Sequence, residues 1–223
     1  MIRRAQNPLR DERGVAAIEF AVLAPLMVAL IIGSVDLAGG FYASQKVHNL
    51  AQTVADLAAR PVSCGTSQSR ICISAGEMSD LFNAARALVT PFSANNLKVT
   101  ISEAGVFADD NGQISARVIW SVTESGEKRA CGPLQAGNAR PVASASIPSA
   151  LLDKTADGAP VTGAVIIVDA SLPYSAVGGS GPAINLESTG YATVRNLRRS
   201  SDPAALPIGH IRNESGMGTN CVS

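Results

Sequence analysis

The residue types that most often carry chemistry are scarce in this chain of 223 residues, which has four cysteines and two histidines. A Ser-His-Asp site would need His48 or His210 beside a nucleophile, and no Gly-x-Ser-x-Gly motif accompanies either histidine. The glycine-rich residues 178–181 lack the lysine and the strand-to-helix setting of a phosphate-binding loop. The sequence therefore predicts a protein that is not an enzyme and that uses no cofactor.

Glu19 is the only charged residue within residues 15–35, an otherwise almost wholly apolar run. About 20 such residues form a helix that spans the roughly 30 Å hydrocarbon core of a bilayer, so the run predicts a membrane helix. An ionised carboxylate at membrane depth costs about 2.5 kcal/mol or more unless it is paired. Glu19 is therefore expected to stay protonated, to lie near the headgroups and water, or to pair with a partner.

A secretory signal peptide is the alternative interpretation of this run. The run is longer than the usual apolar core of about 7–15 residues, carries Glu19, and ends without a clean small-x-small cleavage site, which favours a retained anchor. Four arginines within residues 3–13 precede it, whereas the first cation after it is Lys46. This asymmetry predicts a cytoplasmic N-terminus and a domain outside the membrane, which in a bacterium is a single-pass inner-membrane protein with a periplasmic domain.

The cysteines are expected to form disulfides in such an oxidising compartment. A zinc site would need closely spaced cysteine pairs or nearby histidines, and a redox pair would need a Cys-x-x-Cys motif; the sequence has neither, which predicts no metal site. Cys64 and Cys72 flank a short polar loop, which favours pairing these two and pairing Cys131 with Cys221. Four cysteines allow three connectivities, so the pairing stays open at this point.

The start of the apolar run resembles a known processing site. Residues 10–20 read Arg-Asp-Glu-Arg-Gly-Val-Ala-Ala-Ile-Glu-Phe: a basic leader ends in Gly14, and Glu19 is the fifth residue after it. This pattern resembles type IV pilin-like proteins. The Glu19-Phe20 pair and Pro25 inside the run resemble, more narrowly, TadE-like minor pseudopilins of tight-adherence (Flp) pilus systems. Val15 differs from the aromatic residue or methionine that major pilins usually have after the cleavage point.

The resemblance implies cleavage between Gly14 and Val15, and subunit assembly through Glu19 and Phe20, with Glu19 pairing with the amine of Val15 on a neighbouring subunit. It implies a minor pilin-like subunit for assembly of a tight-adherence pilus, incorporated into a surface pilus and serving cell adhesion. The implied partners are a prepilin peptidase, the Flp pilin, a second minor pseudopilin, and the assembly platform with its ATPase.

Two other functions remain open. One is an unprocessed single-pass periplasmic scaffold or secretion accessory protein; the other is an exported enzyme or ligand-binding domain released by signal peptidase. Nucleic acid is not an expected partner, because 18 basic residues balance 18 acidic ones and no long basic cluster follows the leader.

Downstream of the apolar run, the spacing predicts that the helix continues to Pro61. Its buried stripe is expected at Val47, Leu50, Val54 and Leu57. Gly39 and Gly40 suggest a kink where the helix leaves the membrane. A capping box formed by Ser74 and Glu77 predicts a second helix that ends before Pro91, with a buried stripe at Leu81, Phe82, Ala85, Leu88 and Val89.

Alternating residues predict a hairpin from strands 97–102 and 114–123, joined by the turn signal at 109–112. One face of the second strand is expected to carry Ile114, Ala116, Val118, Trp120 and Val122. A strand buried on both faces is expected at 162–171, and a last short strand at 191–195.

The sequence as a whole predicts an α+β fold: a long N-terminal helix, half transmembrane and half amphipathic, followed by a small periplasmic domain with an antiparallel sheet. The expected segments are a basic leader (1–14), the membrane and extended helix (15–60), the periplasmic domain (61–200) and a loosely structured tail (201–223).

Overall fold

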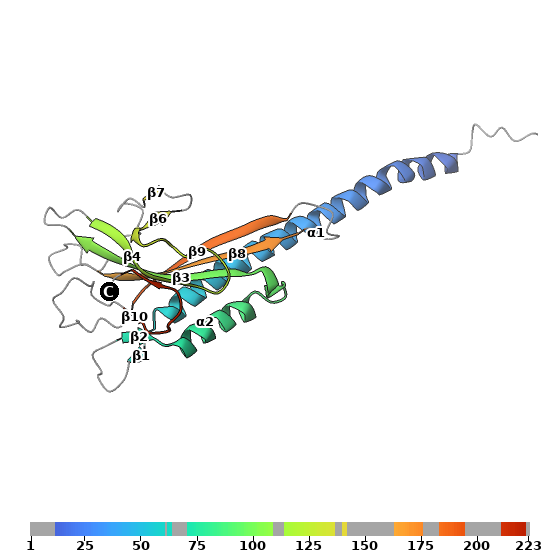
Figure 1. Cartoon of the computed structure of the whole chain (residues 1–223). Coiled ribbons are helices and arrows are strands. Elements are labelled where there is room, and N and C mark those ends of the chain that lie inside the picture. Colours follow the sequence, from blue (N-terminus) through green and yellow to red (C-terminus); the bar gives the residue numbers. More distant parts are fainter. Residues whose placement is uncertain are drawn as a thin grey trace, which may run out of the picture.

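A long helix projects from a compact sheet-and-helix domain in the computed structural model of this chain (Figure 1). The structure describes residues 12–60, 62–63, 71–108, 114–136, 140–141, 163–175, 183–194 and 211–221. The long helix, α1 (Glu12–Ala58), passes through Pro25 without a break. The α+β fold predicted from the sequence, a long N-terminal helix followed by an antiparallel sheet, is confirmed.

The main sheet is antiparallel and has the strand order β11-β4-β3-β8-β9, with β5 paired to β4. Its long strands are β3 (Lys98–Ala108), β4 (Ile114–Thr123), β8 (Ala164–Tyr174) and β9 (Ile184–Thr193). β5 (Gly132–Pro133) and β11 (Thr219–Asn220) are short. The predicted hairpin is the β3–β4 pair, whereas the turn signal at 109–112 and the glycine-rich residues 178–181 lie outside the described residues.

Three shorter strands form a second sheet beside the end of α1. β1 (Val62–Ser63) pairs antiparallel with β2 (Ile71–Ile73), and β10 (Arg212–Asn213) pairs parallel with β2. β6 (Gln135–Ala136) and β7 (Arg140–Pro141) form a separate two-stranded pair. Residues 211–221 are therefore ordered through β10 and β11, which corrects the prediction of a loose tail for this part of 201–223.

The second helix, α2 (Ala75–Leu88), begins at the predicted capping box. The Ser74 Oγ accepts a hydrogen bond from the Glu77 backbone N–H at 3.3 Å, and the Glu77 carboxylate accepts one from the Ser74 backbone N–H at 2.8 Å. These two bonds satisfy backbone donors that a helix start would otherwise leave unpaired. Met78, Phe82 and Ala85 are the buried residues within α2, and Leu81 and Leu88 are only partly buried.

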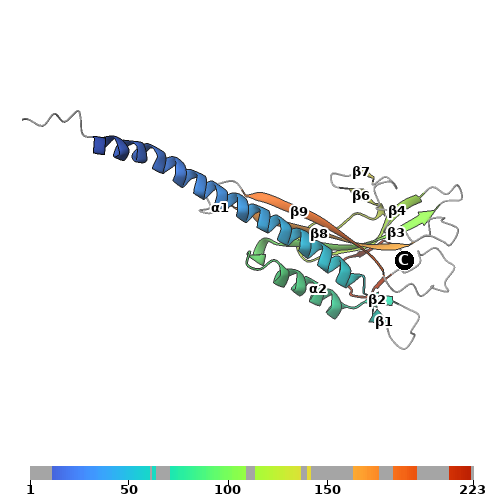
Figure 2. The same ribbon diagram turned by 180° about the vertical axis from the view of Figure 1, so that it is seen from behind.

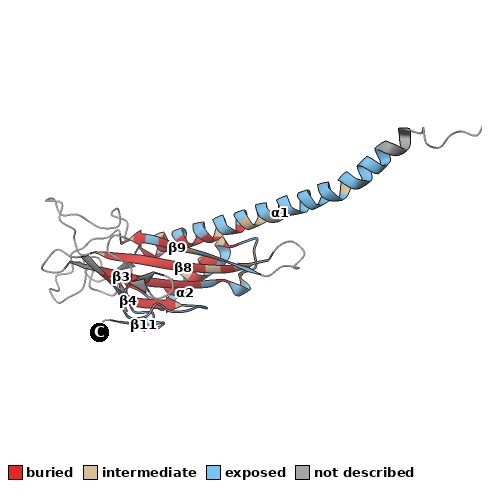
Figure 3. Ribbon diagram, turned by 90° about the horizontal axis from the view of Figure 1, so that it is seen from above, coloured by how far each residue is buried: buried red, intermediate tan, exposed pale blue. Residues whose placement is uncertain are grey.

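α1 and α2 share one hydrophobic core with the sheet, and the C-terminal half of α1 runs along β8 and β9 (Figures 2 and 3). The buried stripe of α1 consists mainly of small residues: Ala43, Val47, Leu50, Ala51, Val54, Ala55 and Ala58. The predicted Leu57 is 37% exposed and does not belong to this stripe. Alanine side chains let the helix lie close to the strands, and the predicted stripe did not include these alanines.

A β-bulge changes which side chains of β4 face the helices. Glu103 pairs with Trp120 and Ala104 pairs with Val118, so Ile119 is an extra residue on β4. Such a bulge shifts the alternation of side chains by one residue. Trp120 and Val122 consequently lie in the core beneath the helices, whereas Ala116 and Val118 join a separate cluster with Leu134, Val165 and Ile167. The prediction that these β4 residues share one face was therefore wrong.

Candidate functional site

The N-terminal half of α1 presents an apolar surface to its surroundings. Its large hydrophobic side chains from Ile18 to Phe41 are each 54–71% exposed. Figure 3 colours almost all of the part of α1 that projects from the domain as exposed. Soluble monomers rarely expose a contiguous apolar surface of this extent. Burying each such side chain in an apolar medium gains about 1.5–3 kcal/mol. The helix is therefore built to be covered by lipid or by other apolar helices.

This half of α1 is the one helix in the described part of the chain that is long and apolar enough to cross a membrane. At 1.5 Å per residue, residues 16–35 cover about 30 Å, the thickness of a bilayer's hydrocarbon core. By length and composition, α1 is thus a candidate membrane anchor.

Glu19 lies one turn into this apolar segment. Its side chain is exposed, and within the described residues it has neither a hydrogen-bond nor an ion-pair partner. Phe20, beside it, is 71% exposed. The backbone of Gly14 and Val15 is helical, so Val15 and Glu19 are one turn apart on the same side of α1. Any partner for the carboxylate must come from outside the described part of the chain.

The other half of α1 is fixed firmly to the domain. The Gln52 Nε2 donates a hydrogen bond of 2.9 Å to the Tyr191 carbonyl of β9. His48 is exposed, and its Nδ1 lies 3.1 Å from the Ser188 Oγ. His48 therefore helps to attach the helix to β9, while His210 lies outside the described residues. A pull on the apolar half would be transmitted directly to the domain, because one continuous helix belongs to both.

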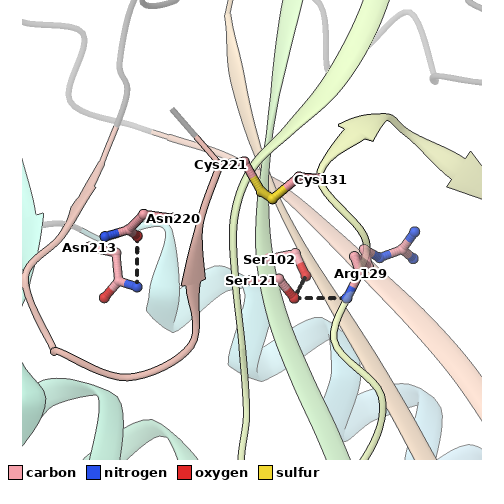
Figure 4. Close-up of a disulfide and its surroundings, with 7 residues drawn as sticks. All are labelled: Ser102, Ser121, Arg129, Cys131, Asn213, Asn220 and Cys221. Atoms are coloured by element: carbon pink, nitrogen blue, oxygen red, sulfur yellow. Dashed lines mark hydrogen bonds between the residues drawn. A yellow bond between two sulfur atoms is a disulfide. The ribbon is translucent and has the colours of Figure 1, made fainter. Parts of the chain in front are cut away.

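One of the two predicted disulfides is visible. Cys131 and Cys221 are bonded, as predicted, and link residues 90 positions apart (Figure 4). The Cys221 N–H also donates a hydrogen bond of 2.7 Å to the Ile119 carbonyl. Cys72 is disulfide-bonded too, but Cys64, its predicted partner, lies outside the described residues. The Cys131–Cys221 bond ties the C-terminal segment to the edge of the main sheet.

A buried polar contact that the sequence did not reveal holds the same segment. Glu103 is fully buried on β3, and its carboxylate accepts hydrogen bonds from the Trp120 Nε1 and, at 3.0 Å, from the Ile211 N–H. The Trp120 Nε1 also donates to the Ile211 carbonyl at 2.8 Å. The available signal was the position of Glu103, two residues after Ile101 and in phase with the apolar residues of β3, because a carboxylate on that buried side must find donors.

Arg129 and Asp169 form a second unpredicted polar contact. The Arg129 Nε and one terminal nitrogen donate to the two Asp169 carboxylate oxygens at 2.7 and 2.8 Å, and the Thr189 Oγ1 donates to the same carboxylate at 2.9 Å. The two side chains are 17% and 34% exposed. This bidentate pair attaches the segment after β4 to β8. The bidentate geometry and the added Thr189 bond indicate a structural role for this pair.

Comparison with known proteins points to the same helix. Residues 14–56 match the model of a family described as TadE-like protein. The matched segment begins at Gly14 and ends near the C-terminus of α1, so it contains Glu19, Phe20 and Pro25. The match confirms the family resemblance predicted from these residues and indicates a protein associated with a tight-adherence (Tad) pilus. No curated protein and no solved structure shows a significant match to the chain.

Proposed function

We propose that this chain is a minor pilin-like subunit, a pseudopilin, of a bacterial tight-adherence pilus. The observation that carries the proposal is the exposed apolar half of α1 with Glu19 one turn from Val15, inside the segment that matches the TadE-like family. A prepilin peptidase would cut between Gly14 and Val15 and leave the amine of Val15 as the new N-terminus. The protein then acts by assembly and catalyses no reaction.

Glu19 sets the position of the subunit among its neighbours in this proposal. An exposed carboxylate without a partner is costly at membrane depth, and an ammonium group of a neighbouring chain would offset that cost. Only one axial offset between two helices brings the Glu19 carboxylate to the Val15 amine of the next subunit. The apolar surface provides non-specific packing, and the charge pair selects the register.

The domain would be carried into the assembly as a rigid unit. α1 is continuous from the apolar half into the core, where Val47, Leu50 and Val54 are almost fully buried. The proposed partners follow from the family resemblance: a prepilin peptidase, the Flp pilin, a second minor pseudopilin, and the assembly platform with its ATPase. They would act on a chain that spans the inner membrane once, with its N-terminus in the cytoplasm.

The Cys131–Cys221 disulfide supports placing the domain in the periplasm. Disulfides persist in oxidising compartments and are rare in the bacterial cytoplasm. The bond joins two distant parts of the domain, so it belongs to the folded structure rather than to an exposed loop. The apolar half of α1 separates this domain from the basic leader.

Substitution of Glu19 tests the proposal. Glu19→Ala and Glu19→Gln remove the charge and make the helix more apolar, so both variants should remain in the membrane fraction after alkaline extraction. Pilus assembly should fall at least about tenfold, as expected when a desolvated charge pair worth more than about 1.4 kcal/mol is lost. Glu214→Ala, which removes an exposed acid of the domain, is the matched control. Normal piliation in both Glu19 variants would exclude the register role.

A further inference from the structure

Three aromatic rings gather at one end of the domain. Tyr42 lies on α1, Phe92 follows α2, and Tyr174 ends β8. The ring centroids of Tyr42 and Phe92 are 5.7 Å apart, and those of Phe92 and Tyr174 are 6.2 Å apart. We call these three residues the aromatic cluster. It brings together three elements that are distant in sequence.

The aromatic cluster lies where α1 leaves the domain. Tyr174 packs against Gly39 and Gly40, and a Cβ at position 39 would lie 2.5 Å from the Tyr174 hydroxyl oxygen. That hydroxyl donates a hydrogen bond of 3.4 Å to the Asp36 carbonyl. The helix is continuous here, and the two glycines make room for Tyr174. Asp36 directly follows the last residue of the apolar run.

Exposed apolar residues belong to the same end of the domain. Phe41 is 64% exposed, Ile184 is 62% exposed and Tyr42 is 48% exposed. Ile184 pairs with Tyr174 across the β8–β9 ladder, so a residue remote in sequence reaches the same end of the domain. Figures 1 and 2 both show the ends of β8 and β9 lying along α1 at the point where it extends beyond the domain.

The depth of these residues follows from the length of α1. Phe41 and Tyr42 are six and seven residues beyond the end of the apolar run at residue 35, which is about 9–10 Å along the axis. The headgroup layers add about 5–8 Å on each side of the hydrocarbon core, and an average tilt of about 20° shortens the height of these residues by only about 6%, so their backbone lies at the outer boundary of the headgroup layer. Tyrosine rings are enriched at this level because they have an apolar body and a polar tip.

We infer that this end of the domain rests on the outer headgroup layer of the membrane that α1 spans. The surface consists of Phe41, Tyr42 and Ile184, supported by Phe92 and Tyr174. The occupant is the lipid interface rather than another protein, because the surface is continuous with the membrane-crossing segment and the Tyr174 contact prevents the domain from moving away from α1. This inference rests on the membrane insertion that is part of the proposed function.

A cation beside the cluster suits the same surface. The Lys46 Nζ lies 5.6 Å from the centroid of the Tyr42 ring, one turn further from the membrane. A flexible lysine stem can extend its ammonium group towards anionic lipid phosphates while its methylene groups cover the ring. The domain would therefore be held at a fixed tilt on the membrane before assembly, with β8 and β9 rising away from the surface.

Tryptophan quenching by lipid distinguishes this arrangement from a domain held in water. The full chain is reconstituted in vesicles of phosphatidylcholine and phosphatidylglycerol whose acyl chains are brominated near the headgroups. Trp120 is the only native tryptophan and is buried in the core, so the unmodified chain supplies the baseline. Ile184→Trp places a reporter at the inferred contact. Leu30→Trp is the positive control within the apolar run.

Arg117→Trp is the matched negative control. Arg117 is exposed on β4 and pairs with Gly105, which pairs with Ala164 at the opposite end of β8 from Tyr174. Ten residues of strand separate the two ends, which is about 33 Å. The measured quantity is the tryptophan emission of each variant above that of the unmodified chain. The inference predicts that brominated lipid lowers this emission about twofold for Ile184→Trp, as for Leu30→Trp, and leaves it unchanged for Arg117→Trp.

The remaining outcomes separate the inference from the proposed function. Quenching of Leu30→Trp without quenching of Ile184→Trp would overturn the inference and leave the membrane anchor standing. Equal quenching of Ile184→Trp and Arg117→Trp would also overturn it, because the whole domain would then lie against lipid. If Leu30→Trp is not quenched, α1 does not insert, and both the anchor and the inference are wrong.

Discussion

Gly190 on β9 lies directly against the backbone of Ala51 on α1, and no side chain fits between them. A Cβ at position 190 would overlap the Ala51 carbonyl group and crowd the Gln52 backbone nitrogen. Neighbouring residues hold the same contact through the hydrogen bond from Gln52 to the Tyr191 carbonyl. The attachment of the long helix to the sheet therefore depends on a glycine in a strand, a position where glycine usually marks such a close approach.

Gly190→Ala should destabilise the domain by about 2–3 kcal/mol or more, because rigid backbone surrounds the added methyl group. The measurement is thermal unfolding of the full chain in detergent, followed by Trp120 fluorescence. Gly76→Ala is the control: no atom lies within 4 Å of its added Cβ, and Gly76 is in α2, so this variant should be as stable as the wild type or up to about 1 kcal/mol more stable. Equal stability of the Gly190 variant and the wild type would contradict the close packing.

Glu103→Leu should cost about 1–3 kcal/mol, because the buried Ile211 N–H loses its acceptor. The Trp120 Nε1 keeps its second acceptor, the Ile211 carbonyl. Glu103→Gln retains one carbonyl oxygen and should cost less than the leucine variant. Urea unfolding followed by Trp120 emission measures the free energy of unfolding of both variants and shows which one is less stable. A leucine variant more stable than the glutamine variant would show that the carboxylate contributes little to holding residue 211.

Replacement of both Cys131 and Cys221 by serine should lower stability by up to about 4–5 kcal/mol in the chain-entropy model, because the bond closes a loop of 90 residues. The C-terminal segment should also become more accessible, since β11 is only two residues long. Limited proteolysis followed by mass spectrometry would detect early cleavage after residue 211. Unchanged protection would show that the strand pairings of β10 and β11 and the contacts of Ile211 hold the segment without the disulfide.

Ser74→Ala should reduce stability by about 1 kcal/mol, because it removes the Ser74 Oγ that accepts from the Glu77 N–H and leaves only the bond from the residue 74 backbone N–H to the Glu77 carboxylate. Ser79→Ala, at an exposed position inside the same helix, is the matched control and should be neutral or slightly stabilising. Thermal unfolding of the two variants side by side tests the role of the cap. An equal effect of both substitutions would rule out the capping contribution.

The sequence predicted the elements whose periodicity is local. The capping box, the long helix, the β3–β4 hairpin and the buried strand β8 each depend on residues close together in the chain. The candidate processing and assembly residues could also be predicted from the sequence, because Gly14 and Glu19 lie within one short motif. Their positions on α1 follow directly from the helical repeat.

The features that the sequence did not predict depend on contacts between distant residues. The bulge at Ile119 reverses the alternation of β4, and nothing within the strand's own pattern marks it. The C-terminal segment is rich in glycine, asparagine and serine, yet Ile211 is fully buried because Glu103 and Trp120 bind its backbone. The Arg129–Asp169 pair likewise joins a polar segment to a strand 40 residues away. Local propensity carries no information about such partners.

In the proposed function, cleavage makes Val15 the N-terminus of the mature chain. The Glu19 carboxylate of one subunit then pairs with the Val15 amine of a neighbouring subunit. The most direct test is intact-mass and N-terminal analysis of the protein from cells with and without their prepilin peptidase. The account predicts a chain that begins at Val15 only when the peptidase is present. An intact Met1 in both strains, together with normal function of a Gly14 variant, would contradict it and identify an unprocessed membrane-anchored accessory protein.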